Sequence, residues 1–523
     1  MLFDRIKPLD AILATAEKKS LHRSLGPVQL TLLGVGAIIG TGIFVLTAEA
    51  AQKAGPGMMW SFVIAGFVCA VAALCYSELA SMVPVSGSAY TYTYAVMGEL
   101  LAWMVGWALI LEYAVAASAV CVGWSGYFVG LLRDYVGITI PEAFAAGPYA
   151  GGLLNLPALL IGLLVTWLLM IGTSESAKVN AALVAIKVAA LTLFVFATFK
   201  YLNNGPNFTP FTPNGWGIIG VGGAAASIFF AYVGFDAVST AAEETKNPQR
   251  NVPIGLIGSL AICTVFYLLV AGGAIGAIGA QPVTGVNGEV LSPGSSELAD
   301  RCASLAAMGS EPLACSKEAL AHVLKSIGWT KLGGVIGIAA GLALPSVILM
   351  MLFGQTRIFF VMARDGLLPE KLATIHPKWK TPHIVTAITG VFVATAAAFL
   401  PVGKLADISN SGTLFAFFMV AIAVLVLRIK DPKRHRPFKT PLIWVTAPLA
   451  VIGTLSLYLL LPFDAKMVLP VWGALGLAIY FAYSRSRSHV GRGSVEIHED
   501  DPDTPPVPVP PLPGVHTPGG KDA

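Results

Sequence analysis

Long apolar runs separated by short polar segments repeat along the chain between residues 28 and 484. A helix needs about 20 mostly apolar residues to cross the hydrocarbon core of a bilayer. We therefore expect an all-α polytopic membrane protein. By this criterion the pattern predicts twelve spanning helices, at residues 28–50, 58–80, 99–130, 154–172, 180–200, 216–241, 253–278, 332–361, 383–401, 407–428, 441–461 and 467–484.

The composition supports this class. Of the 523 residues, 55% are hydrophobic and 12% are charged, and the mean hydropathy is +0.74. A soluble domain has about 25% charged residues. The net charge of +4 gives no reason to expect a nucleic-acid partner, because charge in a membrane protein is interpreted loop by loop. The lipid bilayer is the large partner that we expect.

Lysine and arginine are unevenly distributed between the loops. If the loops alternate from a cytoplasmic N-terminus, the cytoplasmic segments hold 23 of them and the opposite side holds nine, with Lys187 inside a helix. The positive-inside rule then predicts cytoplasmic termini in the plasma (cell inner) membrane. Residues 1–27 become a cytoplasmic leader. The Pro-rich tail, 486–523, is expected to be disordered, with a peptide-ligand role as the alternative.

The longest polar loop, residues 279–331, lies on the extracytoplasmic side in this topology and contains Cys302 and Cys315. An oxidising compartment would allow them to form a disulfide. The sequence does not supply the required Cβ geometry, so two free thiols are the equal alternative. The other cysteines lie in apolar runs and are interpreted as small core residues: Cys69, Cys75, Cys121 and Cys263.

Four glycines lie within the first apolar run, in the segment GVGAIIGTGIFV at residues 34–45. They indicate either a close helix–helix contact or a break in the helix. A break at membrane depth costs several kcal/mol per freed backbone group unless the break lines a cavity. A second interruption, at Gly234 and Asp236 in FFAYVGFDAVS of the sixth run, favours the break. Interrupted helices in corresponding positions indicate an inverted-repeat transporter whose substrate lies near the midplane.

The same segments resemble one family. GVGAIIGTGIFV with the downstream AGPG is similar to the first helix of the amino acid–polyamine–organocation superfamily. FFAYVGFDAVSTAAEETKNPQRNVPIGL resembles the sixth helix and following loop of its cationic amino acid transporter branch, and YSELASMVPVSGSAYTYTYAVMGELLAWMVGWALILEY resembles its second and third helices. The resemblance covers about residues 25–485. It implies a LeuT-like fold, with five-helix repeats at 28–200 and 216–428 and two extra helices at 441–484.

The resemblance also implies the substrate, an L-amino acid that is cationic, small and neutral, or either. Its ammonium would bind carbonyl groups freed by unwinding, those of Ile38, Phe230 and Val233. Phe230 would also cover the substrate as an aromatic gate, although without the break it would be interpreted as a core or lipid-facing residue. The carboxylate would bind backbone amides at the start of a half-helix. These amides belong to the GTG turn: Gly40, Thr41 and Gly42.

Lys187 lies within the fifth run, in NAALVAIKVAALTLFVFA. A charge inside the bilayer is costly and usually functional. Its place in the run makes snorkelling toward the cytoplasm strained. Proton-coupled members of the family have a fifth-helix lysine that bonds carbonyls of the broken first helix, where sodium-coupled relatives hold an ion. The resemblance therefore implies proton coupling through Lys187 and no cofactor.

Two acidic residues lie deep in the predicted helices. Glu112, in the third run, matches a family glutamate that lines the substrate cavity. It could bind a cationic side chain, take part in proton exchange, or pair with Lys187 as a structural couple. Asp236 could contact the substrate or cap amides freed in the broken helix. Charged residues near the ends of runs are interpreted as interface or gate residues: Glu49, Glu78, Glu243, Glu244 and Arg357.

Other functions fit the sequence less well. None of the eight histidines lies in the middle of a predicted span and there is no HExxH motif, so we expect neither an intramembrane hydrolase nor a metal site. A sensor that binds amino acids without moving them would share every site feature. Uncoupled exchange and sodium symport are the transport alternatives, although Ser346 is the one hydroxyl in the central eighth run that a sodium site could use. The chain carries no signal for or against a small accessory membrane subunit.

Overall fold

The computed structural model describes residues 5–7, 25–83, 88–172, 177–240, 242, 245–379 and 381–492. Most of the predicted leader, the tail beyond residue 492, and Glu243 and Glu244 lie outside the described residues. Within the described residues the secondary structure is helical apart from two isolated bridges, Leu25 with Thr245 and Thr284 with Val290. The predicted all-α class is therefore confirmed.

Every predicted apolar run contains helix. The first half of the chain contains α2 (Pro27–Ile38), α3 (Thr41–Phe44), α4 (Leu46–Ala54), α5 (Met58–Met82), α6 (Ser88–Met97), α7 (Glu99–Leu131), α8 (Glu142–Ala145), α9 (Leu156–Met170), α10 (Ala177–Thr198), α11 (Val221–Ile228) and α12 (Ala237–Thr240). The second half contains α13 (Pro248–Ile278), α14 (Ser296–Ala307), α15 (Ala319–Ser326), α16 (Thr330–Arg364), α17 (His383–Phe399), α18 (Val402–Lys430), α19 (Ile443–Leu460), α20 (Phe463–Ile479) and α21 (Arg485–Arg487).

In the described residues, eight helices are long and apolar enough to cross a membrane. Shorter apolar helices account for the other four predicted runs: Pro27–Ile38, Leu156–Met170, Val221–Tyr232 and His383–Phe399. The first and sixth runs fall in this shorter group because each is interrupted. Counting only the long helices of the described residues therefore misses four of the apolar runs that the sequence predicts.

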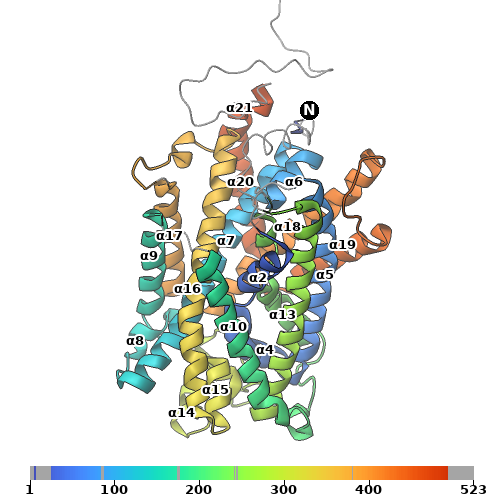
Figure 1. Ribbon diagram of the computed structural model, residues 1–523. Helices are drawn as coiled ribbons and strands as arrows, with labels where there is room; N and C mark the ends of the chain where they lie inside the picture. Colours follow the sequence, from blue (N-terminus) through green and yellow to red (C-terminus); the bar gives the residue numbers. More distant parts are fainter. Residues whose placement is uncertain are drawn as a thin grey trace, which may run out of the picture.

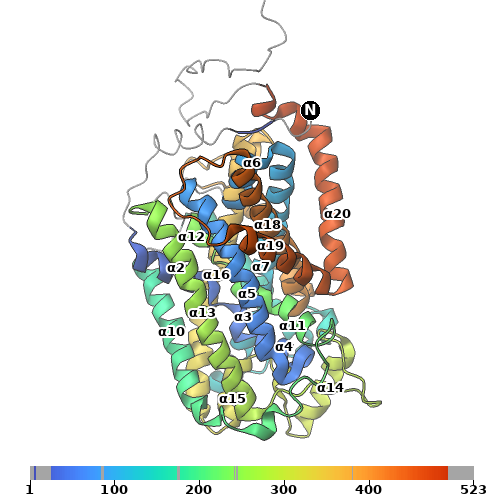
Figure 2. The same ribbon diagram turned by 90° about the vertical axis from the view of Figure 1, so that its right-hand side faces the viewer.

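The helices form an elongated bundle, and most of them run along its long axis (Figures 1 and 2). Helices α6 and α21 lie at one end, called the α21 end below, and α8, α14 and α15 lie at the other (Figure 1). Residues 486–492, which we expected in the disordered tail, instead continue the structure at the α21 end. There the Ser488 hydroxyl donates to the Glu99 carboxylate at the start of α7.

Helix α7 is the centre of the bundle. It packs against α16, α17, α18 and α9, and its most apolar stretch is 94% buried inside the protein. The peripheral helices α19 and α20 are only 33% and 22% buried over the corresponding stretches. Large apolar side chains such as Trp444 and Val471 are exposed there, at 64% and 69%, as expected for a lipid-facing surface. A residue in the middle of α7 therefore lies far from lipid.

Glu78, which we expected to be an interface or gate residue, lies in a buried ion-pair cluster. It is 1% exposed, and its carboxylate accepts two hydrogen bonds of 2.8 Å from Arg428 and one of 3.1 Å from Arg436. The backbone amide of Thr440 donates to the same carboxylate at 2.8 Å. Since Arg428 lies in the last turn of α18 and Thr440 precedes α19, this buried cluster fixes the connection between those helices to α5.

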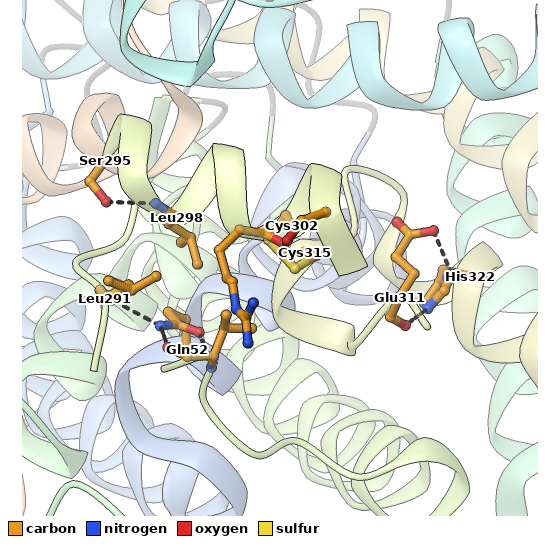
Figure 3. Close-up of a disulfide and its surroundings, with 11 residues drawn as sticks. Gln52, Leu291, Ser295, Leu298, Cys302, Glu311, Cys315 and His322 are labelled. Carbon is orange, nitrogen blue, oxygen red and sulfur yellow. Dashed lines mark hydrogen bonds and ion pairs between the residues drawn. A yellow bond between two sulfur atoms is a disulfide. The ribbon is translucent and has the colours of Figure 1, made fainter. Parts of the chain in front are cut away.

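The end opposite α21 carries the loop with two cysteines, and in the structure Cys302 and Cys315 form a disulfide (Figure 3). Gln52 of α4 attaches this loop to the helical bundle. Its side chain donates to the carbonyls of Val283 and Leu291 at 2.9 and 2.8 Å, and accepts from the amide of Val283 at 2.8 Å. Gln52 is 1% exposed, so the loop is held to α4 by three buried hydrogen bonds.

Replacing Glu78 should destabilise the protein strongly. Glu78→Ala leaves Arg436, whose side chain is 2% exposed, without its carboxylate partner. Removing one partner of a buried ion pair costs about 3–5 kcal/mol. The control is Asp464→Ala, which removes a carboxylate that is 56% exposed beside Lys404 and should cost at most about 1 kcal/mol. Thermal unfolding of both variants in detergent measures the difference, and equal stabilities would contradict the role given to Glu78.

Candidate functional site

The first apolar run is interrupted between α2 and α3. Helix α2 ends at Ile38, and α3 begins at Thr41. The two residues between them are extended, with φ −72° and ψ 96° at Ile39 and φ −146° and ψ −149° at Gly40. The break therefore falls inside GVGAIIGTGIFV. It leaves the last carbonyl groups of α2 and the first amides of α3 without helical partners.

The sixth run is interrupted in the same way. Helix α11 continues as a short 3₁₀ helix, η6 (Phe229–Tyr232), and Val233 then turns to extended backbone with ψ 139°. Gly234 has φ +112°, in the region that only glycine adopts readily. Helix α12 begins at Ala237. Both of the breaks expected from the sequence are thus present in the structure.

The two breaks lie against each other. A Cβ atom on Gly42 would lie 2.3 Å from the Cα of Ala231, and a Cβ on Gly234 would lie 2.9 Å from the carbonyl oxygen of Ala37. Any larger residue at either position would push the two interrupted segments apart. The glycine cluster in the sequence indicates either a close helix–helix contact or a break in the helix. In the structure these glycines belong to a break and also allow a close contact, so both interpretations hold.

Tyr267 of α13 connects the two breaks. Its hydroxyl lies 3.0 Å from the carbonyl oxygen of Ile38 and 2.8 Å from that of Ala231, and its side chain is fully buried. The carbonyl of Phe230 accepts a 3.2 Å hydrogen bond from the amide of Val233. Each carbonyl oxygen has two lone pairs, so those of Ile38 and Phe230 can accept one further hydrogen bond. Sequence reasoning missed Tyr267, because nothing marks it apart from other aromatic residues in an apolar run.

Lys187 of α10 lies at the first break. Its ammonium donates a 2.8 Å hydrogen bond to the carbonyl of Gly36, and the residue is 2% exposed. In an unbroken helix the Gly36 carbonyl would accept from the amide of Gly40. The lysine therefore takes the place of a helical partner at the interruption and does not extend to an interface.

Thr41, at the start of α3, has a buried hydroxyl that finds no hydrogen-bond partner among the described residues. Helix α7 approaches closely here, since a Cβ on Gly123 would lie 2.5 Å from the Thr41 methyl group. Native proteins satisfy nearly all of their buried polar atoms, so an unpaired one marks a place where a ligand or water completes the structure. The hydroxyl and the first amides of α3 together can bind an anion.

Glu112 and Asp236 form an acidic pair beside the breaks. They are 1% and 3% exposed, and the carboxyl group of Asp236 lies close enough to interact with that of Glu112. Tyr113 donates a 3.0 Å hydrogen bond to Asp236, whereas Oε2 of Glu112 has no partner within the part of the chain that the structure describes. The two buried acidic groups interact electrostatically, so this region favours a cation beside them.

The structure also places Phe230, Val347 and Ser346 near the interrupted helices. Phe230 is 7% exposed and is therefore not lipid-facing. Val347 of α16 lies 3.6 Å from the place of a Cβ on Gly40, so an apolar side chain lies beside the first break. Ser346 donates a 2.8 Å hydrogen bond to the carbonyl of Ala343 in its own helix. The structure thus brings the predicted residues of the first, third, fifth and sixth runs together.

A family model described as amino acid permease matches residues 25–482 of this chain. The chain belongs to the amino acid permease family. The resemblance inferred from GVGAIIGTGIFV and FFAYVGFDAVS is therefore confirmed. Because the match starts and ends within three residues of the predicted helical region, the family accounts for all of the predicted spans.

The permease is similar in sequence to several transport proteins. It is 45% identical over 487 residues to the branched-chain amino acid permease BcaP of Bacillus subtilis (strain 168), covering 92% of this chain and 97% of that protein. It is 41% identical to a methylthioribose transporter of the same organism, covering 92% and 98%. It is 34% identical to the vacuolar cationic amino acid transporter 4 of Arabidopsis thaliana, covering 79% and 64%. Each is named as a permease or transporter.

Adding one methyl group at the contact between the breaks should impair the permease. Gly42→Ala places a Cβ against Ala231, and overpacking of this kind costs about 1–3 kcal/mol. Uptake of amino acid at equal amounts of folded protein should fall at least about fivefold. The control is Gly217→Ala, where no heavy atom lies within 4 Å of the added Cβ. Unchanged uptake by Gly42→Ala would mean that the breaks do not need this contact.

Proposed function

We propose that this permease carries L-amino acids across the membrane by alternating access and couples this movement to protons. The observation that carries the proposal is the meeting of two interrupted helices, with Lys187 bonded to a carbonyl freed at one of them. Membership in the amino acid permease family supports an amino acid as the cargo. A LeuT-like arrangement of repeats is proposed because the interruptions fall in the first and sixth runs.

The breaks offer a partner for each end of a zwitterion. The substrate carboxylate binds at the start of α3, to the free amides of the GTG turn and the unpaired hydroxyl of Thr41. The substrate ammonium lies toward the free lone pairs of the Ile38 and Phe230 carbonyls. Glu112 supplies the negative charge that a buried ammonium needs, since it already lies beside a second carboxylate.

Val347, the apolar residue beside the first break, favours an aliphatic substrate side chain. Val347 lies against the position of Gly40, and contact between its side chain and an aliphatic group desolvates no polar atom. The relative with 45% identity is named for branched-chain amino acids, and the plant relatives are named for cationic ones. We place branched-chain and other neutral L-amino acids first, and cationic amino acids second.

The hydrogen bond that Lys187 donates at the first break supports the proposed proton coupling. The protonated amine donates to the Gly36 carbonyl and stabilises the ends of the break, whereas burial disfavours a charge. A change in the shape of the break therefore changes the affinity of the lysine for its proton, and the reverse holds by linkage. The termini are proposed to be cytoplasmic, because the basic loops gather at the α21 end.

Uptake into proteoliposomes tests the coupling. An inward proton gradient should drive accumulation of labelled L-leucine by about tenfold per pH unit for one coupled proton, and a sodium gradient at fixed pH should have no effect. A competition panel of aliphatic, aromatic and cationic L-amino acids then ranks the substrates. Stimulation by sodium would overturn the coupling proposal. Binding of L-leucine without net flux would instead identify a sensor.

A variant of Lys187 separates coupling from binding. Lys187→Met keeps most of the side-chain volume but removes the proton, so L-leucine binding should be retained while the dependence of uptake on pH becomes flat. The control is Lys200→Met, which changes an exposed lysine at the end of the same predicted run and should keep the wild-type pH profile. A wild-type profile in Lys187→Met would show that the lysine only satisfies the Gly36 carbonyl.

A further inference from the structure

A groove at the α21 end lies outside the site described above. It has a volume of about 540 Å³ and lies between the first turns of α13 and the connection from α18 to α19. Figure 2 shows this connection approaching the start of α13. Its walls are formed by Gln249, Arg250, Pro253, Ile254, Ile257 and Gly258 of α13 and by Pro437 and Phe438 of the connection.

The groove is preformed, because its second wall is held rigidly. The amide of Phe438 donates to the Ser81 hydroxyl at 3.3 Å, and the hydroxyl of Thr440 donates to the Leu74 carbonyl at 3.0 Å. In the same connection, the Arg436 side chain and the amide of Thr440 also donate to the buried Glu78 carboxylate. The connection is therefore attached to α5 at several points and cannot close over the groove without breaking buried bonds.

Both walls carry positive charge that has no carboxylate partner among the described residues. Arg250 lines the groove, and Lys439 follows directly on the lining residue Phe438; both are exposed. Lys246, Lys430 and Lys433 in the same two segments are also exposed, and none of these five is paired with a carboxylate in the described residues. Asp431, the one acidic residue of the connection, is 3.7 Å from Arg434. The groove therefore complements an anion.

The floor of the groove continues into a lipid-facing surface. Ile254 is 42% exposed in the groove, and Ile262 and Val265, farther along the same face of α13, are 41% and 59% exposed. Trp444, 64% exposed in the first turn of α19, lies close in sequence to the other wall. Exposed tryptophan is typical of the level of the lipid headgroups. A ligand that fits both parts is anionic at one end and apolar along the rest.

We propose that this groove binds an anionic phospholipid of the same leaflet, with its phosphate on Arg250 and Lys439 and an acyl chain along Ile254. Basic pockets between helices at a membrane surface are suited to such headgroups. A soluble anion would gain nothing from the apolar floor. The chain's own leader is a poor competitor, because its residues 8–24 carry more basic than acidic side chains. The inference concerns lipid binding and does not depend on the substrate or coupling proposed above.

The test uses the full-length protein with phosphatidylglycerol as the probe, measured by native mass spectrometry and with phosphatidylcholine as the neutral comparison. Each basic contact with an anionic headgroup is worth about fivefold in affinity, so Arg250→Gln with Lys439→Gln should weaken phosphatidylglycerol binding about thirtyfold. The control is Lys371→Gln with Lys378→Gln, which removes the same charge from exposed positions outside the groove. Binding by the control should stay within about twofold of wild type.

A second measurement identifies the occupant without relying on the charge variants. A photo-activated benzoylphenylalanine in place of Ile254 should form its main adduct with phosphatidylglycerol in vesicles that contain it. An adduct with the leader of the same chain or with a second copy would overturn the proposal. So would equal loss of binding in both charge variants, or displacement of the lipid by glycerol phosphate at similar concentrations.

Discussion

The structure depends on one constraint: a backbone group freed inside a bilayer must find a partner within the protein. Each interruption meets this constraint with a side chain from another span. Lys187 bonds to Gly36, and Tyr267 reaches both Ile38 and Ala231. An unpaired buried carbonyl costs about 1–3 kcal/mol. Because these side chains satisfy the freed carbonyls, the two helices can be interrupted where they meet. Among the described residues, the Thr41 hydroxyl stays without a partner at the first break.

Features that are marked by a few neighbouring residues could be predicted from the sequence. The two breaks and Lys187 could be located from the sequence, because glycine clusters and a lone charge stand out in apolar runs. Tyr267 could not be found, since its role depends on the distance between helices that are far apart in sequence. The ion pairs of Glu78 could not be found for the same reason: its arginine partners lie some 350 residues away, so nothing near it showed that it is buried.

Charge at the site is distributed unevenly between the elements. Lys187 lies at the first break, whereas Glu112 and Asp236 lie close to each other on α7 and in the second break. A positive group on the substrate would relieve the repulsion between the two carboxylates, and a proton would do the same in its absence. The positive charge of the candidate site therefore lies at one interruption, and its acidic pair lies beside the other.

The interruption of the first span also has a mechanical consequence outside the bilayer. Helix α4 is separated from α2, and Gln52 joins α4 to the disulfide-containing loop through three buried hydrogen bonds (Figure 3). A displacement of α4 would therefore carry the loop with it as one rigid piece. An antibody fragment that immobilises this loop would consequently arrest half of an intramembrane helix without touching it.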